Sequence, residues 1–104
     1  MEKELLFKVA TPLGFEVRCS RPYWDFLVSE KHPALKGREE DVKLALVDPV
    51  EIRGSRKDKE VYLFYSGGQP RWLCAVAKKD GMDGFLVTAY PTDRVKIGEV
   101  VWKK

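Results

Sequence analysis

Hydrophobic and polar positions alternate in short segments along most of the chain, and apolar residues recur at helical spacing in two further stretches. Alternation with a period of two is typical of strands that bury one face. The strands predicted in this way are residues 4–10, 14–19, 50–55, 61–65, 71–78, 84–90 and 97–102. The two helices are predicted at residues 20–31 and 38–47. This order predicts an α+β domain, with both helices packed on one face of a twisted antiparallel sheet.

The two predicted helices have recognisable ends. Ser20 is a good N-cap, and Pro22 falls in the first turn, where proline is tolerated. The first helix is expected to stop before His32, because the residue ahead of a proline is pushed out of the helical region. Gly37 then separates it from the second helix, which begins with acidic residues. The only histidine of the chain therefore lies in the connection between the two helices.

Each predicted strand has two faces, and the helices can cover only one of them. On the uncovered face we expect a cation, hydroxyls and aromatic rings, namely Arg53, Ser55, Thr88, Tyr90 and a tyrosine from residues 61–65. The same alternation groups Leu86 with Thr88 and Tyr90. This set suits a phosphodiester, because arginine binds phosphate oxygens bidentately and aromatic rings stack on bases. The alternative is an ordinary solvated sheet face without a ligand.

The composition is that of one globular domain that spans residues 1–104. The charged share is 34% and the net charge is +3, which permits an anionic partner without requiring one. No apolar run approaches the roughly 18 residues of a membrane helix. The N-terminus lacks the apolar block of a signal peptide, so we expect a cytoplasmic protein. The absence of asparagine and the single glutamine favour a heat-tolerant source.

The two cysteines do not form a close-spaced pair. Cys19 and Cys74 lie in different predicted strands, which favours buried free thiols and leaves a disulfide as the alternative. With one histidine and no Cys-x-x-Cys sequence, a structural zinc site is not expected. We therefore expect no metal and no cofactor.

Five segments follow one another in the order KHPALKG, LVDPVEIRGS, VYLFY, GFLVTAYPTD and IGEVVW. In this order they resemble small phage-borne and prokaryotic nuclease domains of the barnase–EndoU–colicin–RelE-like grouping, which are metal-independent RNA-cleaving domains and toxins. The resemblance covers residues 21–104, and the hairpin of residues 1–20 either extends the sheet or covers its edge. It implies RNA on the exposed face of the sheet and, for a toxin, an antitoxin protein that covers this face.

The resemblance also implies positions for the active-site groups. The histidine falls on His32, the arginine on Arg53 with Ser55 close behind, and the hydroxyl-bearing strand on Thr88 and Tyr90. Metal-free RNA cleavage needs a base for the 2′-OH, a cation for the phosphorane and an acid for the leaving 5′-oxygen. His32 is the candidate base or acid, Arg53 the cation, and Thr88 an orienting hydroxyl. His32 and Arg53 then have to converge over the same uncovered patch of the sheet.

A single histidine leaves one proton-transfer role without an assigned residue. Tyr65, Tyr62 and Tyr90 are candidates, and we predict Tyr65 as the catalytic one. The predicted RNA-binding residues are Lys31, Ser55, Arg56, Lys57, Tyr62 and Tyr90. The reaction leaves a 2′,3′-cyclic phosphate, so DNA is expected to bind without being cut.

Each of these residues also has a purely structural interpretation. His32 can fill the corner between the helices with its ring hydrogen-bonded to a backbone carbonyl. Arg53 can pair with Glu51 or Glu60 on the surface. The chain is then a catalytically inactive module that binds RNA or protein on the same fold, or a structural domain without a nucleic acid ligand.

Overall fold

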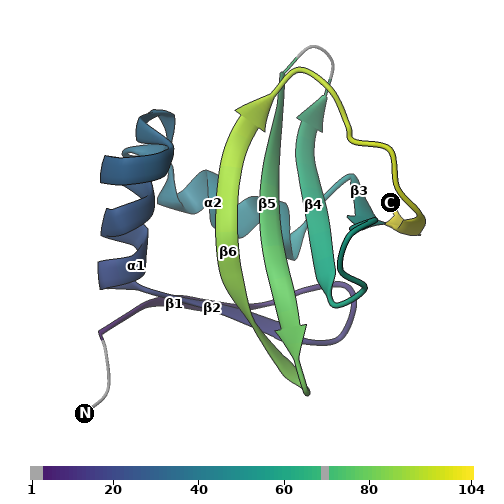
Figure 1. Ribbon diagram of the computed structural model, residues 1–104, viewed down its shortest axis with the longest axis horizontal. Coiled ribbons are helices and arrows are strands. Elements are labelled where there is room, and N and C mark those ends of the chain that lie inside the picture. Colours follow the sequence, from purple (N-terminus) through teal and green to yellow (C-terminus); the bar gives the residue numbers. More distant parts are fainter. Residues whose placement is uncertain (1–3, 69–70) are drawn as a thin grey trace.

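The computed structural model describes residues 4–68 and 71–104 and has an α+β architecture (Figure 1). Its elements in chain order are β1 (Leu5–Ala10), β2 (Glu16–Ser20), α1 (Arg21–Phe26), the π-helical turn η1 (Leu27–Lys31), the 3₁₀ turn η2 (Pro33–Leu35), α2 (Glu39–Val47), β3 (Glu51–Gly54), β4 (Val61–Gly68), β5 (Arg71–Asp80), β6 (Asp83–Thr92) and β7 (Val100–Lys103). Across the described residues the strands form a seven-stranded sheet in the order β1-β2-β6-β5-β4-β3-β7. The predicted fold class is confirmed at this level.

The sheet is mixed, so the prediction of an antiparallel sheet is wrong at one strand pair. β2 runs parallel to β6, with pairs from Glu16 and Asp83 to Arg18 and Phe85. All other neighbouring strands are antiparallel. The chain leaves β2 directly into α1 and returns as β6 only after both helices and three strands, so no short turn forces the two strands to run in opposite directions. The N-terminal hairpin therefore extends the sheet.

The helices cover one face of the sheet and enclose the main core. α1 begins as predicted, since the Ser20 hydroxyl accepts a hydrogen bond from the Tyr23 N–H at 3.2 Å. Trp24 and Leu27 are almost fully buried under this segment, as is Leu46 from α2. They pack against residues of β2 to β6, including Val17, Ile52, Phe64, Leu73, Ala75 and Leu86. Burying a side chain of this size stabilises the fold by about 1.5–3 kcal/mol, so this layer fixes the helices on the sheet.

The opposite face of the sheet carries a second, smaller cluster. Leu63, Tyr65 and Cys74 are buried there, and Trp72 and Tyr90 pack around them. Figure 1 views the molecule from this side, with α2 behind the sheet and α1 beside β6. We call this side the open face, because neither α-helix lies over the middle strands in this view. The prediction that the helices leave one face uncovered is therefore confirmed.

An irregularity in β6 overturns one predicted face. Val76 pairs with Thr88 while its neighbour Ala77 pairs with Leu86, so Val87 is an extra residue in the β6 strand. Such a bulge shifts the alternation of side chains by one position. Leu86 consequently points into the helix-side core, whereas Thr88 remains on the open face. The Val87 carbonyl accepts a hydrogen bond from the Tyr23 hydroxyl at 2.5 Å, which gives the bulged backbone a polar partner.

Candidate nucleic-acid interface

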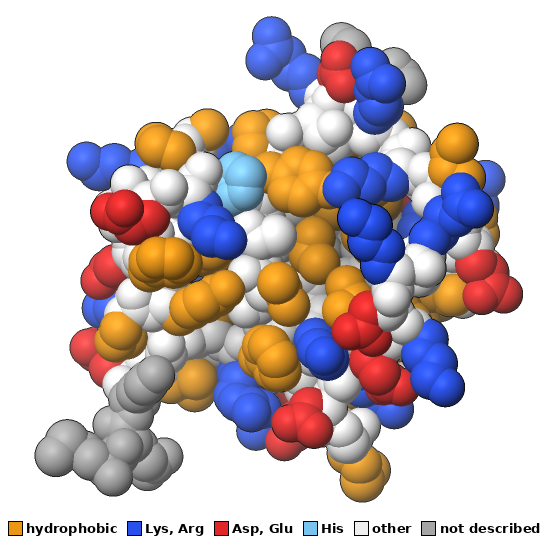
Figure 2. All heavy atoms as spheres, in the orientation of Figure 1, with side chains coloured by type: hydrophobic (Ala, Val, Ile, Leu, Met, Phe, Trp, Pro, Cys, Tyr) orange, Lys and Arg blue, Asp and Glu red, His pale blue; other side chains and the backbone are white. Residues whose placement is uncertain are grey.

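A groove of about 370 Å³ crosses the open face between β6 and the segments that flank β3. It contains many of the predicted site residues, which are Arg53, Ser55, Arg56, Lys57, Thr88 and Tyr90. It also contains Lys96, which sequence reasoning did not select. We call it the basic groove, defined by the cations Arg53, Arg56, Lys57 and Lys96. In Figure 2, blue Lys and Arg side chains gather on the same face beside a hydrophobic surface.

The register of the strands explains why these residues meet. Arg53 pairs with Leu63, Leu63 with Val76, and Val76 with Thr88, so these four side chains lie in one row across β3, β4, β5 and β6. Leu63 and Val76 form an apolar floor between the cation at one end and the hydroxyl at the other. The three strand spacings in this row amount to about 14 Å between the Arg53 and Thr88 backbones. The row of side chains therefore spans four strands of the open face.

Arg53 is held by two hydrogen bonds. Its Nε donates to Glu51 Oε2 at 2.6 Å, and its Nη1 donates to the Gly98 carbonyl at 3.3 Å. The predicted alternative, an ion pair with Glu51, is therefore present. The pair leaves the Arg53 side chain 25% exposed. Arg53 lines the groove, but a neighbouring carboxylate offsets part of its charge.

Tyr90 connects the histidine to the groove. The ring centroids of His32 and Tyr90 are 5.8 Å apart, and Lys96 Nζ lies 5.5 Å from the Tyr90 ring centroid. An ammonium group at this distance is attracted by the aromatic ring. His32 is fixed at its position by the end of η1, where its N–H donates to the Leu27 carbonyl at 2.7 Å. The chain leaves the helical conformation at His32, as predicted.

His32 and Arg53 share the open face but do not touch. Arg53 lines the groove, whereas His32 lies at its rim against Tyr90. Figure 2 shows the pale blue histidine beside hydrophobic side chains, with the nearest large group of cations on their far side. The expected convergence is therefore limited to a shared surface, with Tyr90 between the two groups.

Tyr65 lies under the groove, where its role is structural. Its side chain is fully buried, and its hydroxyl accepts a hydrogen bond from the Lys96 N–H at 3.0 Å. Burial raises the pKa of Tyr65 to about 12, and burial also raises the pKa of Tyr90 above its usual value. Both phenols therefore keep their protons at neutral pH and are unsuited to act as bases. Among the predicted proton-transfer residues, only His32 is left for that role.

Two hydroxyls in the groove lack partners within the described structure. Thr88 Oγ1 and Tyr90 Oη are buried and form no hydrogen bond of ordinary geometry. Cys74 and Tyr65 are the groups that act on the pKa of Tyr90 besides burial, and a thiol is a weak hydrogen-bonding partner. Thr88 can orient a ligand only after its side chain rotates toward the groove.

The two remaining predicted residues, Tyr62 and Lys31, do not line the basic groove. Tyr62 lies on the helix side, where its ring centroid is 5.9 Å from that of Phe15. It cannot join the basic groove, because β4 alternates regularly and sends only Val61, Leu63 and Tyr65 to the open face. Lys31 is exposed and directly precedes His32 at the end of η1.

Lys96 was missed because it lies in a connection rather than a strand. The segment between β6 and β7 packs back onto the open face, where Val95 contacts the cluster around Tyr65. The one available signal was Val95 itself, an apolar residue within a charged connection. Such a residue indicates that a loop is packed on the protein, but not on which face it lies.

No family model matches the chain, and neither the curated proteins nor the solved structures include a significant match. No helix in the described part of the chain has the length and apolar character needed to cross a membrane. Among residues 4–68 and 71–104, no three His, Cys, Asp or Glu side chains are grouped so that they could hold a metal ion. Inference about function therefore depends on the geometry of the open face.

Proposed function

We propose that the protein cleaves single-stranded RNA without a metal, with the strand lying along the basic groove and His32 acting at its rim. The observation that carries this proposal is the contact of the only imidazole with Tyr90, an aromatic ring that also lines a groove with four cations. Cations along a groove attract the phosphate backbone, and aromatic rings provide stacking surfaces for bases. The resemblance of the ordered segments to RNA-cleaving domains favours RNA over other polyanions.

The reaction divides among the residues as follows. His32 takes the proton of the ribose 2′-OH, and the 2′-oxygen attacks the adjacent phosphorus. Arg53, oriented by Glu51, stabilises the charge of the phosphorane. The bond to the 5′-oxygen breaks, and this oxygen takes a proton from the Lys96 ammonium group. The products are a 2′,3′-cyclic phosphate and a 5′-hydroxyl end, so DNA is bound but not cut.

A second candidate function is RNA binding without cleavage. The ion pair between Arg53 and Glu51 favours it, since the guanidinium is partly neutralised before any phosphate arrives. The position of His32 behind Tyr90 favours it as well, because a base has to lie within hydrogen-bond reach of the proton that it removes. In this case the basic groove and Tyr90 hold the strand, and no bond is broken.

The test is digestion of single-stranded RNA by the purified protein in EDTA, with mass analysis of the product ends. Cleavage is expected to survive EDTA, to leave cyclic phosphate ends and to spare DNA. His32→Ala should lower the rate by about 10²-fold or more with RNA affinity retained, because general acid–base catalysis contributes about 10²–10⁴-fold. The matched control is Lys36→Ala, a change at an exposed cation in the same connection.

The outcomes separate the candidates. Equal cleavage by wild type and His32→Ala would reject the assigned role of His32. Binding of RNA by the wild type without cleavage would select the binding module. A toxin-type nuclease should also arrest growth when it is expressed without a partner that covers the open face, and His32→Ala should relieve the arrest.

A further inference from the structure

A second cavity, larger than the basic groove, lies elsewhere on the molecule. It measures about 660 Å³, is open to solvent and is lined by α2, the ends of β4 and β5 that face each other, and the end of β6. Leu73 and Pro91 contribute apolar surface, and Ser66 and Thr92 contribute hydroxyls. Two arginines, Arg38 and Arg71, also line it. A cavity with an apolar floor and a few polar groups is typical of a ligand site.

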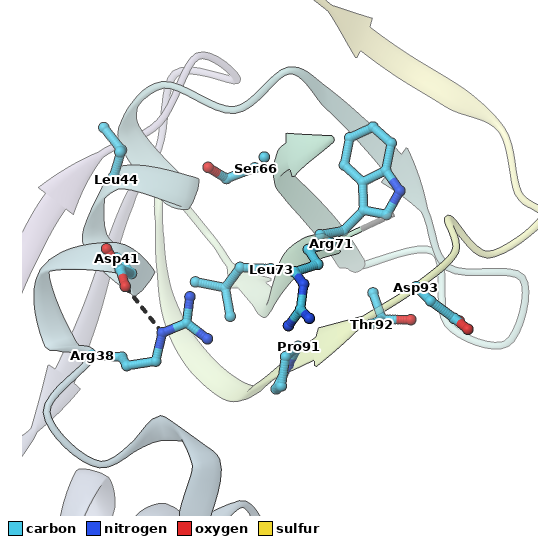
Figure 3. A pocket seen from close by; sticks show the side chains of 11 residues that line it. Arg38, Asp41, Leu44, Ser66, Arg71, Leu73, Pro91, Thr92 and Asp93 are labelled. Carbon is cyan, nitrogen blue, oxygen red and sulfur yellow. Dashed lines mark hydrogen bonds and ion pairs between the residues drawn. The ribbon is translucent and has the colours of Figure 1, made fainter. Parts of the chain in front are cut away.

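The two guanidinium groups enter this cavity from different walls. In Figure 3, the Arg38 guanidinium extends from the start of α2 toward Leu73, and the Arg71 guanidinium extends from β5 toward Pro91. Arg38 Nε donates to Asp41 Oδ2 at 3.0 Å, which leaves its two terminal nitrogens directed into the cavity. Arg71 forms no ion pair with another described residue.

The acidic groups on the cavity walls do not separate the two arginines. Asp41 lies behind Arg38 as its ion-pair partner. The Asp93 carboxylate points away from the arginines and lies 3.5 Å from Arg94 Nε. Two like charges thus face a common space with no carboxylate between them. An anion with several oxygens, such as a phosphodiester, can accept hydrogen bonds from both guanidinium groups in this position.

The cavity lies on the helix side of the sheet, whereas the basic groove lies on the open face, so the two regions approach each other only at the end of β6. Tyr90 lines the groove and Thr92 lines the cavity, and these two residues lie on the same side of the strand about 7 Å apart. Trp72 lines the cavity, and its ring centroid is 6.3 Å from that of Tyr65, which is buried under the groove. A strand that leaves the groove past Tyr90 meets Trp72 and Thr92, and it reaches the arginines by passing around the end of β6 to the helix side.

We infer that Arg38 and Arg71 form a second phosphate site, which holds a backbone phosphate of the same RNA strand beyond the nucleotide at Tyr90. The inference rests on the proposed function, because it assigns the RNA a path from the basic groove over the end of β6. It makes the ligand an oligonucleotide several residues long. A dinucleotide occupies the basic groove alone and does not reach the second site.

The test is a chain-length series of fluorescent 2′-O-methyl oligouridylates, from about 2 to about 12 nucleotides, measured by anisotropy. The methyl group removes the attacking hydroxyl, so binding is measured without cleavage. Wild-type affinity should rise with length until both sites are filled. Arg71→Ala should weaken binding of the longer oligonucleotides about tenfold and leave that of the shortest within about twofold, since one charged hydrogen-bonded contact is removed.

Salt dependence provides a second measurement. The slope of log affinity against log salt should become shallower by about 0.7 in Arg71→Ala with a long oligonucleotide, as expected for one lost phosphate contact on a single strand. Arg94→Ala is the matched control, because Arg94 is an exposed cation near the same end of β6 and is already paired with Asp93. It should bind every length within about twofold of the wild type. Arg38→Ala, checked for folding by circular dichroism, should repeat the effect of Arg71→Ala.

The failures of the two proposals are distinguishable. Tight binding by Arg71→Ala and Arg38→Ala at every length would overturn the second site and leave the basic groove intact. Equal losses at all lengths, including the shortest, would also overturn it, because the arginines would then act on the groove itself. Failure of the wild type to bind any oligonucleotide would overturn the proposed function together with this inference.

Discussion

The buried thiol of Cys74 should make the protein less stable as the pH becomes alkaline. Cys74 is fully buried under the basic groove, and burial raises its pKa from 9.0 to about 11. In the unfolded chain the thiol loses its proton near pH 9, whereas in the folded protein it keeps it until about pH 11. The contribution of the Cys74 thiol to the unfolding free energy is therefore fully present below pH 9 and is lost as pH rises toward 11. With these two values, the unfolding free energy falls by about 1.4 kcal/mol at pH 10.

The perturbation that isolates this contribution is Cys74→Ala. Unfolding by urea under reducing conditions should be compared for both proteins at pH 8.0, 9.0 and 10.0. Cys74→Ala creates a small cavity and is less stable at pH 8, but the difference should shrink by about 1.4 kcal/mol at pH 10, because only the wild type carries this thiol. The control is Leu63→Ala, which truncates a neighbour on the same face without removing a titratable group. A stability difference for Cys74→Ala that is constant from pH 8 to pH 10 would refute the reasoning.

Three further predictions concern the groove. Glu51→Gln removes the carboxylate bound to Arg53, so RNA binding measured by anisotropy should tighten severalfold, and weaker binding would contradict a phosphate-binding Arg53. Tyr65→Phe removes the acceptor of the Lys96 N–H and should lower the unfolding free energy by about 1 kcal/mol. Amide exchange at Lys96 should accelerate in this variant, and unchanged protection would show that the bond does not hold the loop. For a long single strand, the four cations of the basic groove should contribute about −2 to −3 to the slope of log affinity against log salt, and a flat response would exclude an electrostatic interface.

Much of the fold follows from local sequence patterns. Period-two alternation between turn formers located each strand, and Ser20 and the proline after His32 set both ends of the first helical segment. The parallel pairing of β2 with β6 could not be predicted in this way, because it joins segments that no short turn connects. The bulge at Val87 could not be predicted either. One extra residue changes the direction of the side chains, but it leaves the pattern of residue types along the strand almost unchanged.

For the candidate site too, local patterns predicted some residues, and tertiary packing brought in others that could not be predicted. Arg53 and Thr88 were found because regular strands send their side chains to a known face. Lys96 was missed because the position of a long connection depends on tertiary packing, here the hydrogen bond of its backbone to Tyr65. The Arg38 and Arg71 pair was missed for a related reason, since only the packing of α2 on the sheet brings the start of a helix and the start of a strand together.

The parallel pairing of β2 with β6 has a consequence for synthesis on the ribosome. β2 ends at Ser20, and its neighbour in the sheet begins only at Asp83, so the hairpin has to wait for most of the polypeptide to emerge before it can dock. Contacts between such distant segments form slowly, because a long loop has to close first. Nascent chains that stop before β6 should therefore leave the N-terminal hairpin without its partner strand and more accessible to proteases than in the full-length protein.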